Sequence, residues 1–289
     1  MTGSVSKTQQ SAQGLLSSKR RSVIAPLRLA ALLAITVLPV AAAKPGQEQV
    51  TRDFQKTLSL GAGQSFHIEN KFGGVRIHGE SSRELRISAT IRAQADSREQ
   101  AQSFADKVQI DVQQTAHGVE VHTHYPEDNR NWFGRKNASY SVDYEIAMPS
   151  DAPLVVKNSF GSVNATGVRS KSEFDNSHGS LNVRDTGAAR LSNSFGSIEL
   201  SGAAGDASVT DNNGSVQVSQ VKGSLELRNR FGSITVRAIQ GAANITGGNG
   251  AVNLTDAGSA NITNTDTVAF TGAATLTRHW NHPVLDHGG

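Results

Sequence analysis

The chain has 289 residues, with 28 basic and 25 acidic side chains, a net charge of +3 and no cysteine. Without cysteine, a lipoprotein anchor, a disulfide framework and thiolate metal sites are excluded. The first 43 residues hold five of the basic and none of the acidic side chains, so the rest carries a net charge of −2. No clustered Lys/Arg stripe follows, and we expect no nucleic-acid partner.

Residues 1–43 have the pattern of a secretory signal. A basic stretch precedes the apolar run Leu29–Val40, which ends in small residues at Ala41–Ala43. The run is shorter than the roughly 20 residues that span a bilayer. We therefore expect cleavage after Ala43, no transmembrane segment in the mature protein, and an exported protein in the periplasm, outside the cell or on its surface. The pair Arg20-Arg21 leaves the secretion route open between the general and twin-arginine pathways.

Residues 44–64 are expected to form an N-terminal linker or strand, and residues 65–150 a small α+β portion. Residues 65–79 alternate apolar and polar side chains around a glycine, as a first repeat-like rung would. A helix is expected near 97–110, with Asp96 as N-cap and Glu99 completing a capping box. The polar loop that follows carries Trp132 and Phe133, which we predict as a possible contact site.

Residues 151–274 repeat one pattern. The pentapeptide NSFGS occurs at Asn158–Ser162 and again at Asn193–Ser197. Glycines recur about every 18 residues, and strictly alternating apolar and polar residues follow each of them, which is typical of a strand with one buried face. Uninterrupted periods near 20 residues indicate a solenoid. The repeat glycines are Gly161, Gly179, Gly196, Gly214, Gly232 and Gly250.

The residues around these glycines predict a stacked corner. Asparagine tolerates left-handed backbone angles, and glycine adopts positive φ without steric cost. We expect the asparagines and aromatic residues of successive rungs to form ladders along the coil axis, with His178 in a place otherwise held by phenylalanine. The ladder residues beside the glycines are Asn158, Phe160, Asn176, Asn193, Phe195, Asn229 and Phe231.

The predicted fold is therefore mainly β: the C-terminal part forms a β-solenoid from a single polypeptide, with about 18 residues per rung, and the α+β portion with its one helix precedes it. One rung cannot offset its own conformational entropy, so rungs must stack to share a core. A right-handed coil is expected, although neither the hand nor the oligomeric state follows from the sequence. Beyond Leu254 the pattern degrades into a C-terminal cap, and residues 275–289 are expected to be a flexible tail.

The outward polar positions of the repeat form the predicted binding face. They would make a flat ladder suited to shallow, multivalent contact with an envelope glycan or protein. A polar outer face is also what any solvated strand needs, and that interpretation stays open. The face consists of Asn164, Asn182, Glu199, Gln217, Thr235 and Asn253.

Catalytic and metal sites are not expected, and no cofactor is implied. Of the nine histidines, His122 and His124 project to one side of a strand beside Glu120, but a metal site needs more fixed ligands. Polysaccharide cleavage, the enzymatic alternative, needs carboxylates at a defined separation. The carboxylates that we considered are scattered over different rungs: Glu173, Asp175, Asp185, Asp206 and Asp211.

The glycine–serine steps, the entry segment IAMPSDAPLVV and the secretion signal resemble the putative adhesin family of bacterial β-strand-repeat domains of unknown function. The resemblance covers about residues 65–270, although family members more often have Asp or another residue where this protein has Ser after the corner glycine. It implies an exported, nonenzymatic envelope protein with an adhesive role. An accessory role in envelope sensing, with the solenoid as a partner-docking surface, is the alternative.

Overall fold

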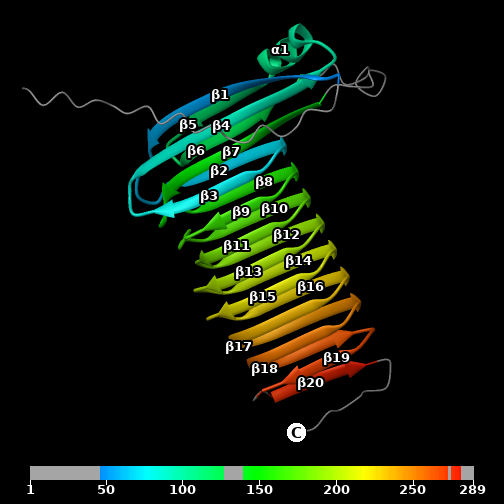
Figure 1. Cartoon of the computed structure of the whole chain (residues 1–289). Coiled ribbons are helices and arrows are strands. Elements are labelled where there is room, and N and C mark those ends of the chain that lie inside the picture. Colours follow the sequence, from blue (N-terminus) through cyan, green and yellow to red (C-terminus); the bar gives the residue numbers. More distant parts are fainter. Residues whose placement is uncertain (1–45, 127–138, 273–274, 281–289) are drawn as a thin grey trace, which may run out of the picture. The chain divides into compact units, whose positions relative to one another are not determined.

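The structure is a computed structural model that describes residues 46–126, 139–272 and 275–280. The predicted signal (1–43) and the loop residues Trp132 and Phe133 lie outside this range. One compact unit contains all of the described residues. Successive coils about 18 residues apart stack into a β-solenoid of about 7 turns, which confirms the predicted fold class (Figure 1).

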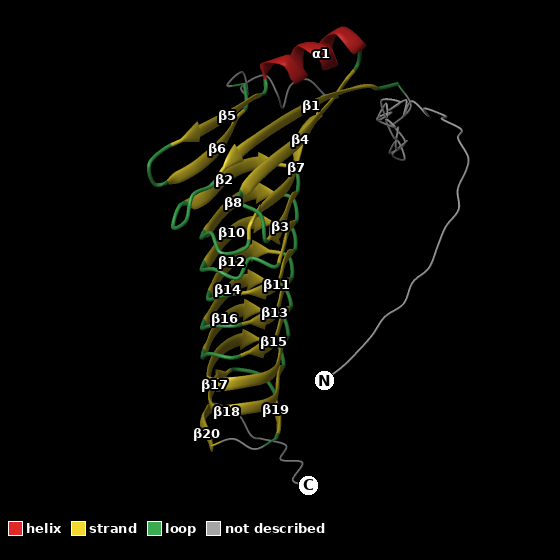
Figure 2. Cartoon of the chain, turned by 90° about the vertical axis from the view of Figure 1, so that its left-hand side faces the viewer, coloured by secondary structure: helices red, strands yellow, loops and turns green. Residues whose placement is uncertain are grey.

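Each coil contributes one strand to each of two parallel sheets, which we name the first wall and the second wall (Figure 2). The first wall consists of β6 (Gly118–His124), β2 (Ser65–Phe72), β8 (Leu154–Phe160), β10 (Ser172–His178), β12 (Ala189–Phe195), β14 (Ala207–Asn213) and β16 (Leu225–Phe231). The second wall consists of β7 (Ser139–Pro149), β3 (Val75–Glu80), β9 (Val163–Thr166), β11 (Leu181–Thr186), β13 (Ile198–Ala203) and β15 (Val216–Val221). The long strands β17 (Ile234–Asn249) and β18 (Val252–Asn264) turn the corner and belong to both walls.

The stacking follows the sequence repeat residue by residue. Val163, Leu181 and Ile198 are direct neighbours in the parallel register, and each is at most 1% exposed. The alternation of the strands thus sends every second side chain into one shared core between the walls. Burying a Val, Leu or Ile side chain contributes about 1.5–3 kcal/mol, and this core runs through every rung.

The N-terminal portion is part of the same stack. Strands β2 and β3 pair in parallel with β8 and β9, so the first repeat-like rung lies directly on the solenoid. Strands β6 and β7 then pair with β2 and β3 and add a further rung, which the sequence did not reveal. The rungs at this end are therefore not stacked in sequence order. The rung of β2 and β3 lies between the rung of β6 and β7 on one side and the rung of β8 and β9 on the other.

In space, β6 and β7 lie on the side of β2 and β3 that faces away from β8 and β9. Antiparallel strands then extend both walls beyond this rung: β4 (Glu84–Ala95) pairs with β7, β1 (Glu48–Ser59) pairs with β4, and β5 (Gln109–Gln114) pairs with β6. The predicted linker or strand at 44–64 thus contains the long strand β1. This end of the solenoid therefore consists of antiparallel strands, of which β1 and β5 lie at the edges, and one helix.

The helix α1 (Arg98–Lys107) connects β4 to β5 and packs on β4 and β1 through the buried Ala101 and Ala105. Its N-cap is Ser97, whose hydroxyl accepts a hydrogen bond from the backbone N–H of Gln100 at 3.3 Å. The expected N-cap, Asp96, is therefore wrong by one residue. Asp and Ser are both good N-cap residues, so the sequence pattern alone did not distinguish them.

A second column of left-handed residues lies at the corner near the end of the second-wall strands from β9 onward. Four of its members are not glycine, and positive φ is uncommon in non-glycine residues, although Asn, Asp and His adopt it more often than others. The sequence gives no glycine period here, so this corner was not predicted. Its members are Gly167, Asp185, Gly202, Gln220, Ala238, Asp256 and Gly272, with φ between 52° and 113°.

Replacing Ala238 by glycine is expected to stabilise the protein by about 0.5–1 kcal/mol. Ala238 has φ of 54°, and this conformation costs a residue with a Cβ about 1–2 kcal/mol, which exceeds the extra chain entropy of glycine. Thermal melting of Ala238→Gly would show the gain. Ala204→Gly, at an exposed position without positive φ, should instead lower the melting temperature; a loss in both variants would contradict the prediction.

The C-terminal end continues the stack further than expected. Strand β19 (Val268–Thr271) pairs with the first half of β18, and Asn264 takes the corner position of the cap, where it donates to the carbonyl of Thr267 at 3.1 Å. Strand β20 (Thr275–Trp280) pairs in parallel with the second half of β18, so the expected flexible tail does not begin at residue 275. Residues 281–289 lie outside the described part of the protein.

Candidate functional site

The corner asparagines form a buried ladder, which we name the asparagine ladder. The Nδ2 of Asn158 donates to Oδ1 of Asn176 at 3.1 Å, and the Nδ2 of Asn176 donates to Oδ1 of Asn193 at 3.2 Å. Asn158 also donates to the carbonyl of Gly161 at 3.2 Å, and the same contact recurs in other rungs. Each of these amide nitrogens thus donates to the glycine carbonyl of its own corner, and these residues are at most 4% exposed. The ladder holds the turns together, and its role is structural.

The aromatic residues beside the ladder form an exposed line, which we name the aromatic ridge. The rings of Phe160, His178 and Phe195 stack at centroid distances of 4.6 and 4.9 Å. The predicted place of His178 in the ring column is confirmed. Phe160 and Phe195 are 44% and 50% exposed, and Phe231, further along, is 43% exposed. Because neighbouring rings cover the faces of His178, the ridge presents mainly ring edges to solvent, and stacking of a sugar ring on it is blocked there.

The predicted binding face is a continuous column on the outer side of the second wall, and we name it the polar column. Parallel register aligns its six members: Asn164, Asn182, Glu199, Gln217, Thr235 and Asn253. Asn182 donates to Asn164 at 3.0 Å, and Glu199 accepts from Arg184 at 2.8 Å. Asn164, Asn182 and Glu199 are thus bonded to neighbouring side chains. The side chains of Gln217 and Asn253, by contrast, are exposed to solvent.

A polar pocket of about 550 Å³ lies on the outer side of the first wall, near the ridge. His122 and Glu69 are among the residues that line it. Nδ1 of His122 is 3.5 Å from a Glu69 oxygen, and Nε2 is 3.6 Å from an oxygen of Glu120. The ring of His67 meets that of His122 edge-on at 5.9 Å, and burial lowers the pKa of His67. Glu69 and His67 belong to the neighbouring rung, which is why sequence spacing did not join them to His122.

These groups do not amount to a metal centre. Among the described residues, no set of three His, Asp or Glu side chains is arranged to hold a metal ion. His124 lines the pocket but makes no contact with the His122–Glu pairs that would complete a ligand set. The pocket is thus a polar patch in which the carboxylates of Glu69 and Glu120 lie on either side of the His122 imidazole.

The carboxylates that were considered for polysaccharide cleavage lie in unlike surroundings. Glu173 and Asp175 are exposed on the outer side of the first wall, whereas Asp211 is buried in the asparagine ladder. Asp185 is in the left-handed corner column, and Asp206 accepts the backbone N–H of Ser224 at 2.8 Å. The structure gives these five residues no common cleft.

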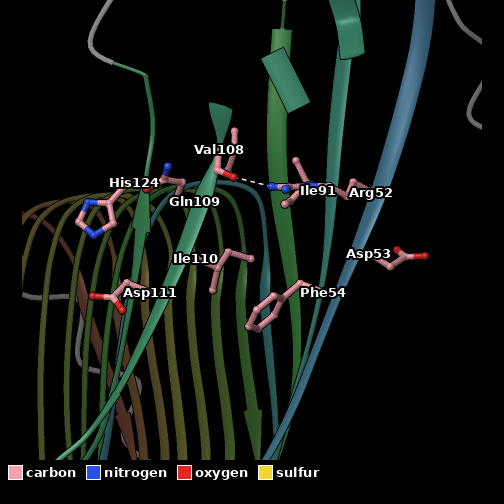
Figure 3. Close-up of a pocket in the computed structure, with 9 residues that line it drawn as sticks. All are labelled: Arg52, Asp53, Phe54, Ile91, Val108, Gln109, Ile110, Asp111 and His124. Carbon is pink, nitrogen blue, oxygen red and sulfur yellow. Dashed lines mark hydrogen bonds between the residues drawn. The ribbon is translucent and has the colours of Figure 1, made fainter. Parts of the chain in front are cut away.

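A groove lies at the N-terminal end, between β1 and β5, and we name it the end groove (Figure 3). Its lining is mixed, because the polar residues Arg52, Asp53, Gln109, Asp111 and His124 stand beside four apolar ones. It has a volume of about 500 Å³. Phe54 and Ile110 line it from opposite sides, and Arg52 reaches across it to the backbone carbonyl of Val108 (Figure 3). Sequence reasoning missed this site because its two sides lie far apart in the sequence. Alternation of apolar and basic residues in β1 is the only signal that the sequence offered.

Solved structures similar to this protein are described as putative adhesins, as a putative cell adhesion protein and, in one case, as a putative lipid binding protein. A putative cell adhesion protein from Clostridium sporogenes is 12% identical; the match covers 71% of this protein and 99% of that one, with a TM-score of 0.37. A putative adhesin from Bacteroides fragilis is 14% identical, with coverages of 82% and 96% and a TM-score of 0.28. A putative lipid binding protein from Parabacteroides distasonis is 13% identical, with coverages of 79% and 96% and a TM-score of 0.34. At such identities and TM-scores, the likeness carries no conclusion about activity.

No family model and no curated protein matches the sequence. The class that the fold defines is a β-solenoid. In the part of the protein that the structure describes, no helix has the length and apolar character needed to cross a membrane.

Proposed function

We propose that this protein is an exported, nonenzymatic protein of the cell envelope that binds surface polymers through the outer face of the second wall. The observation that carries the proposal is the register of the polar column. Strands in a sheet lie about 4.7–4.9 Å apart, so the column offers hydrogen-bonding side chains at regular intervals along the stack. A polymer with its own regular repeat is the kind of ligand that such a row fits.

The affinity of such binding would come from the number of weak contacts made along one polymer. Gln217 and Asn253 have no side-chain partner among the described residues, and Thr235 stands between them in the register. Each contact alone is worth about 0.5–1.5 kcal/mol at most, since water is displaced from both partners. Several contacts along one polymer act together, because the first raises the effective concentration of the next. The signal-like pattern of residues 1–43 supports an envelope location.

The test is a triple variant in which Asn182, Gln217 and Thr235 are replaced by alanine. We expect binding of the mature protein to glycan arrays and to whole bacterial cells to fall at least about tenfold, since three hydrogen bonds of about 0.5–1.5 kcal/mol each are removed. The melting temperature should change little, because all three side chains point away from the core.

In the matched control, alanine replaces Ser192, Thr210 and Thr246. These residues lie in one aligned row on the outer face of the first wall, with Arg228 between the last two. This control should bind as the unmodified protein does. Equal binding by both triple variants would refute the second wall as the binding face. Stoichiometric capture of a single envelope protein, with no polymer bound, would favour a docking role instead.

A further inference from the structure

The end groove lies between two strand edges. Among the described pairings, β1 pairs only with β4, and β5 pairs only with β6, so each has one edge without a strand partner. Between these edges lie four half-buried apolar side chains that pack against the core at this end: Phe54, Leu58, Ile110 and Val112. Unpaired strand edges attract further strands, and proteins commonly protect them with charged side chains that point inward.

Two cations on one face of β1 reach toward β5: Arg52, which lines the groove, and Lys56. Nη2 of Arg52 donates to the carbonyl of Val108, and Nζ of Lys56 donates to the carbonyl of Val112 at 3.4 Å. Among the described residues, neither cation forms an ion pair, and Nε of Arg52 is buried without a hydrogen-bond partner. A half-buried cation held only by a carbonyl is incompletely satisfied, because an ionised partner would give a stronger, charge-assisted bond.

The two carbonyls are four residues apart: Val112 belongs to β5, and Val108 is the extended residue immediately before it. An extended peptide alongside β5 would donate backbone N–H groups to the carbonyls of Val108 and Val112, as a neighbouring strand does. Arg52 and Lys56 would then be released and would need anions. Phe54 lies between them in the alternation of β1, so the side chains facing the groove read basic, apolar, basic.

We propose that the end groove binds an extended segment of a partner protein by strand addition, with the pattern acidic–x–apolar–x–acidic. Main-chain hydrogen bonds to β5 provide the affinity, and alternate side chains provide the specificity. The two acidic residues pair with Arg52 and Lys56, and the apolar residue packs on Phe54 and Ile110. This surface is separate from the polar column, so the proposal stands independently of the proposed function.

The probe is a fluorescein-labelled heptapeptide, Thr-Glu-Thr-Val-Thr-Glu-Thr, titrated into the mature protein and followed by anisotropy. We expect saturable binding that weakens with added salt. Exchange of both Glu for Lys should reduce the affinity at least about tenfold, since like charges then face each other. Methylation of the peptide nitrogens that face β5 should abolish binding, because it removes the donors.

Protein variants locate the site. Lys56→Gln and Arg52→Gln should each weaken binding of the acidic peptide by about twofold to fivefold, as expected for loss of a partly exposed ion pair. Lys56 makes the longer of the two contacts. Lys56→Gln should therefore fold, and it provides the test even if Arg52→Gln does not fold. Arg237→Gln, on the exposed face of the second wall, should have no effect.

Several results would overturn the proposal: no binding of the acidic peptide, equal binding of the lysine peptide, or unchanged affinity in Lys56→Gln. If Arg52 and Lys56 serve only to protect the edges, their removal would instead strengthen binding of any extended peptide and promote self-association, and that result also counts against it. The triple variant of the polar column should bind the heptapeptide normally, which separates failure here from failure of the proposed function.

Discussion

Replacing Gly196 by alanine is expected to destabilise the protein by about 3–5 kcal/mol. Gly196 has φ of 123°, a region that costs other residues about 1–3 kcal/mol. A Cβ at this position would lie 2.4 Å from the carbonyl oxygen of Gly179 in the neighbouring rung. Relief of that overlap requires these two rungs to separate, and the N–H of Gly179 would lose its 2.9 Å hydrogen bond to the carbonyl of Phe195.

The matched control is Gly63→Ala. Gly63 also has positive φ, 78°, but a Cβ there would meet no atom within 4 Å. We expect it to cost only about 1–2 kcal/mol, the backbone strain alone. Denaturation midpoints of both variants give the comparison. If Gly196→Ala were no more destabilised than Gly63→Ala, close contact between successive corners would not be what requires glycine in the repeat.

The repeat made most of the solenoid predictable. Local alternation sends Val163, Leu181 and Ile198 inward, and an unbroken period leaves stacking as the only way to bury them. The glycine corner was predictable for the same reason, because its residue types report a backbone conformation directly. The polar column follows from the same alternation, so its alignment could be foreseen even though its function could not.

The N-terminal end could not be predicted because its pairings are long-range. His67 meets His122 only because β6 stacks on β2 after a long excursion, and Arg52 reaches Val108 across two edges that no local pattern joins. The left-handed corner was missed for a different reason. Neighbouring rungs impose its conformation on Gln220 and Ala238, so tertiary context there overrides the preference of the residue itself.

Asp211 is the exception within the asparagine ladder. It is aligned with Asn193 and Asn229, is 2% exposed, and has no hydrogen-bond partner for either carboxylate oxygen. At this point of the other rungs an amide nitrogen donates to the glycine carbonyl three residues on, as Asn229 does to Gly232 at 3.1 Å. An ionised carboxylate has no proton to donate. Burial is accordingly the main cause that raises the pKa of Asp211 from 3.8 to about 6, and the nearby backbone N–H of Asn212 opposes it only in part.

The raised pKa makes stability depend on pH. The folded state holds the Asp211 proton more tightly than the unfolded state, so this group's favourable contribution is complete below about pH 3.8 and is lost as the pH rises through about 6. A difference of about two pKa units corresponds to about 3 kcal/mol at pH 8, at roughly 1.4 kcal/mol per unit. Above pH 6 the ladder therefore contains a buried charge with no partner.

Replacing Asp211 by asparagine is thus expected to raise the free energy of unfolding by about 2–3 kcal/mol at pH 8, because the amide restores the missing donor without a charge. Melting curves from pH 4 to pH 8 should show a gain that shrinks toward pH 4, where Asp211 itself is protonated. The reverse change, Asn229→Asp, should introduce a similar loss at pH 8, and Asp175→Asn, at an exposed position, should alter little. A gain that is the same at pH 4 and pH 8 would mean that packing, and not ionisation, sets the cost of Asp211.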